Sequence, residues 1–423
     1  MKSNYRHTTL PNGLRVLTVP LKETKAVIVQ IFIGAGSRFE AKNINGISHF
    51  LEHMFFKGGE RYPDTRAVAS ALDGVGGKFN AYTCEESVSF WVKLPQDKVE
   101  LAFDVLSDML LNAKLDITEV DRERNVILEE YNRLEDDPAS NIGDVFQTLM
   151  YGDQPIGRSV IGDVKVLKKL QDKDLVDYKQ HLYIPTNVVI SVAGGISHEK
   201  ALKLVKQYFP YIKADHQVKK TVTKSPTCHN RLILKYKKTN QAHLMLGIPG
   251  VEGDSEDKYA MRLLAAILGG SMSSRLWLNL RERFSLGYAV QTYANFFVDD
   301  GYLVTYAGVD LKRIDLAIKL ILEEYAEMAK TPVSMQELTK NQEMIKGQTL
   351  MAMENSAFWS DWTGEQELLY NKIKTPEEEI AKFMAVTPKD IQKLAARLFK
   401  TEKMHLAVIG PYRNQTDFAK LMK

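Results

Sequence analysis

The chain repeats one pattern, and this repetition restricts its possible folds. Each half holds a strand, a turn, a second strand and a helix, and the copies are offset by about 210 residues. The paired segments are 79–83 (FNAYT) with 288–292 (YAVQT), and 87–94 (SVSFWVKL) with 301–306 (GYLVTY). Two copies are too few for a solenoid, so the repetition predicts two related domains.

The ends of the two copies locate the expected domain boundaries. Strand-like segments at 188–194 (VVISVAG) and 405–410 (HLAVIG) each close one half of the chain. The stretch 214–226 is polar and charged and ends in a proline, which is typical of a linker. We therefore expect an N-terminal domain over 1–213 and a homologous C-terminal domain over 227–423.

The order of strands and helices predicts the α+β class. Strands joined by short turns pair antiparallel, and long amphipathic helices bury their apolar stripe against a sheet. Each domain is therefore expected to be a mainly antiparallel sheet backed by helices, and not a doubly wound parallel sheet. The 423 residues are 44% hydrophobic and 26% charged, which is typical of a globular chain with a normal core.

Charge and cysteine content restrict the partners and the compartment. The net charge of +3 gives no case for nucleic acid or an anionic membrane as partner. Cys84 and Cys228 are the only cysteines, which favours a reducing compartment. The sequence shows no signal-peptide core at its start and no apolar run long enough to span a membrane. A cytoplasmic location is the expectation.

The segment 46–54 (GISHFLEHM) carries the strongest chemical signal. His49 and His53 are four residues apart, so on a helix they share one face and can bind one metal ion. Glu52 precedes the second histidine and reaches the same region, which makes the H-x-x-E-H arrangement. The alternative is two solvated histidines on a surface helix. The surrounding apolar residues argue against it, because they predict a partly buried polar trio that needs a partner.

A second helix, expected over 117–136, offers carboxylates as a third ligand. Glu130 lies four residues after Val126 and three after Ile127, which places it on the apolar face and predicts its burial. Glu129 falls on the polar face. Glu123 is seven residues before Glu130 and shares its face. The alternative for both Glu123 and Glu130 is a solvated stripe of salt bridges.

The run 49–58 (HFLEHMFFKG), followed by Glu130, resembles the inverzincin zinc metallopeptidases. This family includes pitrilysin, insulinase and the mitochondrial processing peptidase, and the chain is most similar to its short bacterial processing-peptidase-like members. The resemblance covers essentially the whole chain, including its duplicated halves. It implies one zinc ion per chain with His49, His53 and Glu130 as ligands, Glu52 as catalytic base and Glu123 as a supporting acid. It also implies an edge strand that receives the substrate, made of Phe79, Asn80, Ala81, Tyr82 and Thr83.

Two segments of the second half add to the resemblance. The segment 280–288 (LRERFSLGY) places the family's arginine and tyrosine roles on Arg281 and Tyr288, and 268–276 (LGGSMSSRL) resembles its glycine-rich loop. Taken alone, each segment more often has a structural role, such as a helix end and a turn. The second half lacks the metal site: the halves align His49–His53 with 262–266 (RLLAA) and Glu130 roughly with Gly347.

The resemblance implies an endopeptidase that hydrolyses unstructured or targeting-type peptides with a zinc-activated water and a Glu general base. Short members of the family pair as dimers around a chamber, and this chain carries the features of both subunit types. A homodimer is therefore expected, with a heterodimer as the alternative. Two other readings stay open: a non-catalytic peptide-binding or scaffold subunit, and one half of a heterodimeric peptidase.

Overall fold

The computed structural model describes residues 5–210, 216–218, 222–224 and 230–422. Two compact units are present, each described here by itself. The first contains 1–131, 159–221 and 349–376, and the second contains 132–158, 222–348 and 377–423. The linker expected at 214–226 lies mostly outside the described residues, as does Cys228, so this domain boundary stays a prediction.

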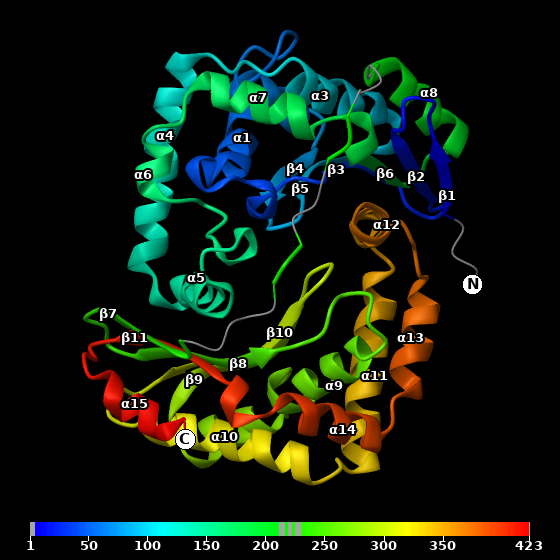
Figure 1. The fold of residues 1–423 in the computed structure, drawn as a ribbon. Coiled ribbons are helices and arrows are strands. Elements are labelled where there is room, and N and C mark those ends of the chain that lie inside the picture. The colour runs from blue at the N-terminus through cyan, green and yellow to red at the C-terminus, as the bar shows by residue number, and fades with distance from the viewer. Residues whose placement is uncertain (1–4, 211–215, 219–221, 225–229, 423) are drawn as a thin grey trace. The chain divides into compact units, whose positions relative to one another are not determined.

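A six-stranded sheet forms the centre of the first unit (Figure 1). Its strand order is β1-β2-β6-β3-β5-β4, and the one parallel pair in it is β2–β6. The β4 strand, which contains the expected substrate strand, lies at the edge of the sheet. The strands are β1 (Arg6–Thr9), β2 (Arg15–Pro20), β3 (Ala26–Ile33), β4 (Lys78–Thr83), β5 (Val88–Pro95) and β6 (Val188–Gly194).

The sheet of the second unit repeats this arrangement with five strands in the order β7-β11-β8-β10-β9. Its one parallel pair is β7–β11, and its edge strand β9 takes the place of β4. The expected duplication and the α+β fold with mainly antiparallel sheets are thereby confirmed. The strands are β7 (Leu232–Tyr236), β8 (Ala242–Pro249), β9 (Gly287–Phe296), β10 (Gly301–Val309) and β11 (His405–Gly410).

Helices back both sheets. Those of the first unit are α1 (Ile47–Phe55), α2 (Thr65–Asp73), α3 (Val99–Leu111), most of α4 (Ile117–Asp136), α6 (Val164–Leu167), α7 (Asp172–Leu182), α8 (His198–Tyr208) and α12 (Ser356–Tyr370). Those of the second unit are α5 (Pro138–Tyr151), α9 (Lys258–Gly269), α10 (Ile314–Lys330), most of α11 (Met335–Ala352), α13 (Pro376–Ala385), α14 (Pro388–Leu398) and α15 (Gln415–Leu421). None of the helices in the described ranges is long and apolar enough to cross a membrane.

Two helices cover the sheet of the half from which they do not come. Helix α5, from the first half of the chain, packs on β8 and β11, and α12, from the second half, packs on β3 and β6 (Figure 1). Phe146 of α5 meets β8 at Gly247, where a Cβ would lie 2.6 Å from the Phe146 ring. On α12 the roles are reversed: a Cβ at Gly364 would lie 2.1 Å from the ring of Phe32 on β3. At both contacts a glycine therefore leaves the space that the facing phenylalanine ring occupies.

Candidate metal centre and active site

Helix α1 carries the H-x-x-E-H residues and is fixed at its beginning by a buried carboxylate. Glu40, only 3% exposed, accepts hydrogen bonds from the backbone N–H groups of Gly46 and Ser48 at 2.7 and 2.9 Å. These amides belong to the free N-terminal end of the helix, which favours a negative charge. Burial nevertheless raises the pKa of Glu40, although its hydrogen bonds oppose this rise. No local sequence pattern indicates this role of Glu40, because its contacts depend on a loop folding back.

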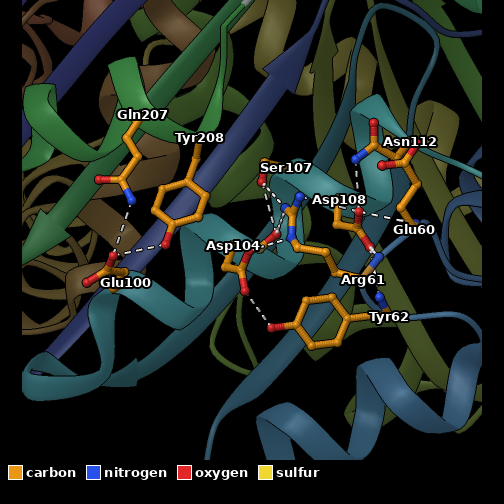
Figure 2. A network of polar contacts seen from close by, with 10 residues as sticks. All are labelled: Glu60, Arg61, Tyr62, Glu100, Asp104, Ser107, Asp108, Asn112, Gln207 and Tyr208. Atoms are coloured by element: carbon orange, nitrogen blue, oxygen red, sulfur yellow. Dashed lines mark hydrogen bonds and ion pairs between the residues drawn. The ribbon is translucent and has the colours of Figure 1, made fainter.

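A second buried carboxylate fixes the loop that follows α1. Asp108 of α3 accepts the backbone N–H groups of Arg61 and Tyr62, each at 2.9 Å, and that of Glu60 at 3.2 Å. Figure 2 shows this carboxylate between the loop and Asn112, which donates a further hydrogen bond. Together with Glu40, Asp108 anchors the segments on both sides of α1, so the helix has little freedom to shift.

His49, His53 and Glu130 come together as the sequence analysis predicted. Their potential ligand atoms all lie within 4.8 Å of one another. Glu130 Oε2 is 3.4 Å from His53 Nε2 and 3.9 Å from His49 Nε2. Two imidazoles and one carboxylate form a donor set that catalytic zinc sites use, with a fourth position left for water or substrate. The three side chains therefore fit a zinc ion.

Glu123 and Lys57 orient the second histidine. Glu123 Oε1 lies 2.8 Å from Nδ1 of His53, so a proton on Nδ1 leaves Nε2 free to face the cluster. The ammonium group of Lys57 contacts the other oxygen of Glu123. Burial alone would raise the pKa of Glu123, but the hydrogen bonds from His53 and Lys57 outweigh it and lower this pKa. Lys57 follows His53 by four residues, and this helical spacing is a sequence signal for its place beside the histidine.

The two histidines have opposite pKa shifts in the metal-free protein. Burial, together with the nearby His53, lowers the pKa of His49 to about 4. Burial also lowers the pKa of His53, but the hydrogen bonds and charges of Glu123 and Glu130 outweigh it and raise the value to about 9. At neutral pH the metal-free cluster therefore holds a proton on His53, which a metal ion must displace to bind.

The relative burial of the two α4 carboxylates differs from the prediction. The Glu123 side chain is 6% exposed, whereas the Glu130 side chain is 35% exposed. Val126, used to define the apolar face, is itself 51% exposed, so the inference that Glu130 is the buried carboxylate was wrong. Glu123 is buried because it turns inward to His53 and Lys57, and Glu130 stays accessible beside the histidines. Glu129 is exposed, as expected.

Glu52 lies on the same helix, near the cluster, and contacts the edge strand β4. Burial raises the pKa of its carboxyl group, against a hydrogen bond from Thr83 that lowers it. The other residues of the expected substrate strand divide by face. Phe79 packs its ring 6.2 Å from that of Phe56, Ala81 is buried, Asn80 is exposed and Tyr82 is half-buried. The edge position of β4 agrees with the resemblance, whereas its substrate role stays a prediction.

Arg281 and Tyr288 lie together in the second unit. Arg281 belongs to a π-helical segment, Trp277–Arg283, a type of distortion that is frequent at functional sites. Its guanidinium group lies 5.7 Å from the ring centre of Tyr288 and 4.6 Å from that of Trp277. The Tyr288 side chain is 77% exposed at the start of β9. In the nearby glycine-rich segment, Gly270 ends α9, which is the structural role considered as its alternative.

Comparison with known protein families agrees with this division of features. Residues 15–164 match the family described as insulinase (peptidase family M16), and residues 169–345 match the one described as peptidase M16 inactive domain. Within the described ranges, a group of residues able to hold a metal ion is found in the first unit alone. The description of residues 169–345 as an inactive domain is therefore consistent with the position of the metal-binding group in the first unit.

Relatives of similar length are named as zinc proteases. The uncharacterized zinc protease YmxG of Bacillus subtilis is 35% identical over 406 residues, which cover 96% of this chain and 98% of that protein. An uncharacterized zinc protease of Streptomyces coelicolor is 32% identical over 97% of this chain and 90% of its own length. Zinc is therefore the metal that the donor set and the relatives have in common.

Solved structures share the fold at lower sequence identity. A protease from Helicobacter pylori superposes with a TM-score of 0.91 at 21% identity, covering 97% of this chain and all 100% of that one. A peptidase M16 inactive domain from Pseudomonas fluorescens has a TM-score of 0.88 at 20% identity, with 97% and 99% covered. With the relatives above, these matches show that the chain belongs to the insulinase (M16) family of zinc metallopeptidases.

Proposed function

We propose that this chain is a zinc endopeptidase that hydrolyses unstructured or targeting-type peptides at the cluster of His49, His53 and Glu130. The observation that carries the proposal is the placement of Glu52. This carboxylate lies on the same short helix as two of the three potential ligands, and it is not itself needed to complete the donor set. A structural metal site has no use for such an additional carboxylate.

The mechanism depends on what Glu52 can do in this position. When bound, zinc supplies a water molecule that is acidic near neutral pH and polarises the scissile carbonyl group. With zinc in place, the Glu52 carboxylate would accept one proton from the attacking water as the water oxygen bonds to the carbonyl carbon. It would then return that proton to the amine nitrogen as the C–N bond breaks. Burial raises the pKa of Glu52, which brings proton uptake and return closer to balance.

Glu123 and Lys57 act on the reaction through His53. The ionised Glu123 accepts the Nδ1 proton of His53, which fixes the tautomer that presents Nε2 to the metal. Lys57 keeps Glu123 ionised and in place. Glu123 is therefore proposed as a positioning residue. The supporting role that the family resemblance implies for it would be to hold the His53 ring in the orientation that binds the metal.

The substrate is proposed to add to β4 as a further strand. An edge strand presents unpaired backbone groups, so main-chain hydrogen bonds would supply affinity that does not depend on the substrate sequence. This agrees with an enzyme that acts on extended, unstructured peptides. Arg281 and Tyr288 are proposed, from the resemblance, to bind the peptide or stabilise the transition state.

The proposal includes a homodimer as the active form. Light scattering of the purified chain distinguishes a dimer from a monomer by mass. A heterodimeric peptidase would instead give a chain that binds zinc and cleaves poorly until a partner is added. The cytoplasmic location stays a prediction from the sequence.

The decisive experiment compares wild type with Glu52→Gln on a mixture of unstructured peptides, followed by mass spectrometry and zinc analysis. We expect the substitution to retain zinc and to lower turnover by about 100- to 10,000-fold, the range typical of a general base. Loss of zinc in Glu52→Gln would contradict the assigned role of Glu52. A zinc-loaded wild type that cleaves nothing would contradict the proposal and favour either one half of a heterodimeric peptidase or a peptide-binding or scaffold subunit.

A further inference from the structure

The side chains of β4 alternate between the two faces of the strand, and this alternation determines which way the Thr83 side chain points. Successive residues of a strand point in opposite directions, so Phe79, Ala81 and Thr83 share one face. This is the face toward α1, because Phe79 packs against Phe56 just after that helix and Thr83 contacts Glu52 within it. The side chain of Thr83 is therefore directed at the catalytic helix, and the free edge of β4 is left to its backbone.

The Thr83 hydroxyl group donates a short hydrogen bond to Glu52. The distance from Oγ1 to Oε2 is 2.5 Å, at the short end of the range for an O–H donor and a carboxylate. In the part of the chain that the structure describes, no protein group is found bonded to the other oxygen, Oε1. One oxygen of the carboxylate is thus held by the protein, and the other remains available to a proton donor.

Threonine is well suited to hold the Glu52 carboxylate in one orientation. Threonine is branched at Cβ and has few accessible rotamers, so its hydroxyl group is held more firmly than that of serine. Thr83 ends a strand that is paired along its length with β5, from Lys78↔Lys93 to Thr83↔Val88. The donor therefore stands on a rigid sheet, and Glu52 has one preferred orientation. A carboxylate that is already held in the reactive orientation transfers protons faster than one that must first rotate into it.

We propose that Thr83 is a positioning residue for the general base Glu52, and that it connects the substrate-receiving edge strand directly to the catalytic helix. This inference rests on the function proposed above. It moves Thr83 from the expected list of substrate contacts to a role inside the protein. Only the backbone of Thr83 would then meet the peptide.

The test uses Thr83→Val, which keeps the shape of the side chain and removes the hydroxyl group, and Thr83→Ser, which keeps the hydroxyl group. Steady-state kinetics on one cleaved peptide, with zinc content measured for each protein, give the readout. We expect Thr83→Val to lower kcat by about 10- to 100-fold with KM and zinc content nearly unchanged. We expect Thr83→Ser to recover most of the lost kcat. Thr65→Val, at an exposed position of α2, is the matched control and should behave as wild type.

Each contrary result has a separate meaning. A Thr83→Val enzyme with wild-type kcat would overturn the inference and leave the proposed function standing. A rise in KM alone would make Thr83 a substrate contact, as the resemblance implies, and would also overturn the inference. Thr83→Ala adds no bulk and repeats the test if the valine protein misfolds. An inactive wild type would contradict the proposed function itself, and the inference would fall with it.

Discussion

Five strands of the first sheet and the five strands of the second follow the same order, but the helices against their edge strands differ in polarity. In the first unit α1 lies against the edge strand β4, and its residues His49, Glu52 and His53 are only partly buried. In the second unit α9 lies against the edge strand β9 and is buried and apolar from Leu263 to Leu268. The same scaffold thus forms with or without a polar cluster.

This difference shows that the metal site is an addition to the fold and not a condition for it. The alignment of the halves puts Arg262 near the position of His49 and Gly347 near that of Glu130. Arg262 covers the ring of Phe296 on β9, with 5.3 Å between the guanidinium carbon and the ring centre. The second half therefore fills the equivalent place with packing, at no cost in buried unpaired charge.

Removing one proposed ligand should leave the first half, like the second, without a complete metal site. We expect Glu130→Gln to weaken zinc binding by more than about 100-fold, since even residues behind the ligands contribute 10- to 100-fold. Cleavage should be lost in parallel. Glu129→Gln is the matched control, because Glu129 is exposed on the same turn of α4. Equal zinc affinity in the two variants would remove Glu130 from the ligand set.

The pH dependence of zinc binding tests the electrostatics that only the first half has. The pKa of His53 is raised to about 9 in the metal-free protein, so zinc must displace one proton at any lower pH. The apparent affinity should therefore rise about tenfold per pH unit between pH 6 and 8, measured by competition with a chelator. Glu123→Gln removes one of the two charges that raise the pKa of His53, so the dependence should become weaker. A flat profile for wild type would mean that His53 is neutral before zinc binds.

Lys57 acts on His53 only through Glu123. Its removal should therefore lower zinc affinity less than the removal of a proposed ligand does. We expect Lys57→Met to lower zinc affinity by about tenfold, because Glu123 loses the cation that keeps it ionised and in place. Lys203→Met, at an exposed position of α8, is the control. If both substitutions leave zinc affinity unchanged, Lys57 has no part in orienting His53.

The smallest effect is expected in the second half and tests whether that half contributes to chemistry at all. Tyr288→Phe removes one exposed hydroxyl group beside Arg281. It should lower kcat by about 2- to 10-fold, the value of one ordinary hydrogen bond, with zinc content unchanged. Kinetics equal to those of wild type would restrict Tyr288 to a structural role.

The histidine pair, the strands and helices and the two similar sheets could be predicted, because each depends on patterns that can be recognised in the sequence. The i, i+4 histidines and the period of strands and helices depend on neighbouring residues, and the duplication predicted two similar sheets. The burial order of Glu123 and Glu130 could not be predicted from periodicity, since it depends on side chains 66 to 81 residues earlier in the chain. Periodicity also does not reveal the bond between Thr83 and Glu52 or the anchoring by Asp108, which join different elements. The contacts of Glu40 are close in sequence, but they depend on the loop before α1 folding back.

Helices α5 and α12 each cover the sheet formed by the other half of the chain, and sequence patterns could not predict this exchange. Their apolar faces, such as Ile142, Phe146 and Met150 on α5, predict burial against a sheet. Periodicity does not say which of two similar sheets receives the helix. The answer depends on shape at single positions, where Gly247 admits Phe146 and Gly364 admits Phe32.

This exchange makes neither half of the chain self-sufficient. A fragment ending before the linker would keep α5 without the strands β8 and β11 that bury its apolar face, and its own β3 and β6 would be bare where α12 belongs. A fragment starting after the linker would have the reverse defects. The two halves are therefore mutually dependent partners within one polypeptide. A loss of solubility in either fragment, relieved by producing both together, is the behaviour that such an interlocked pair would display.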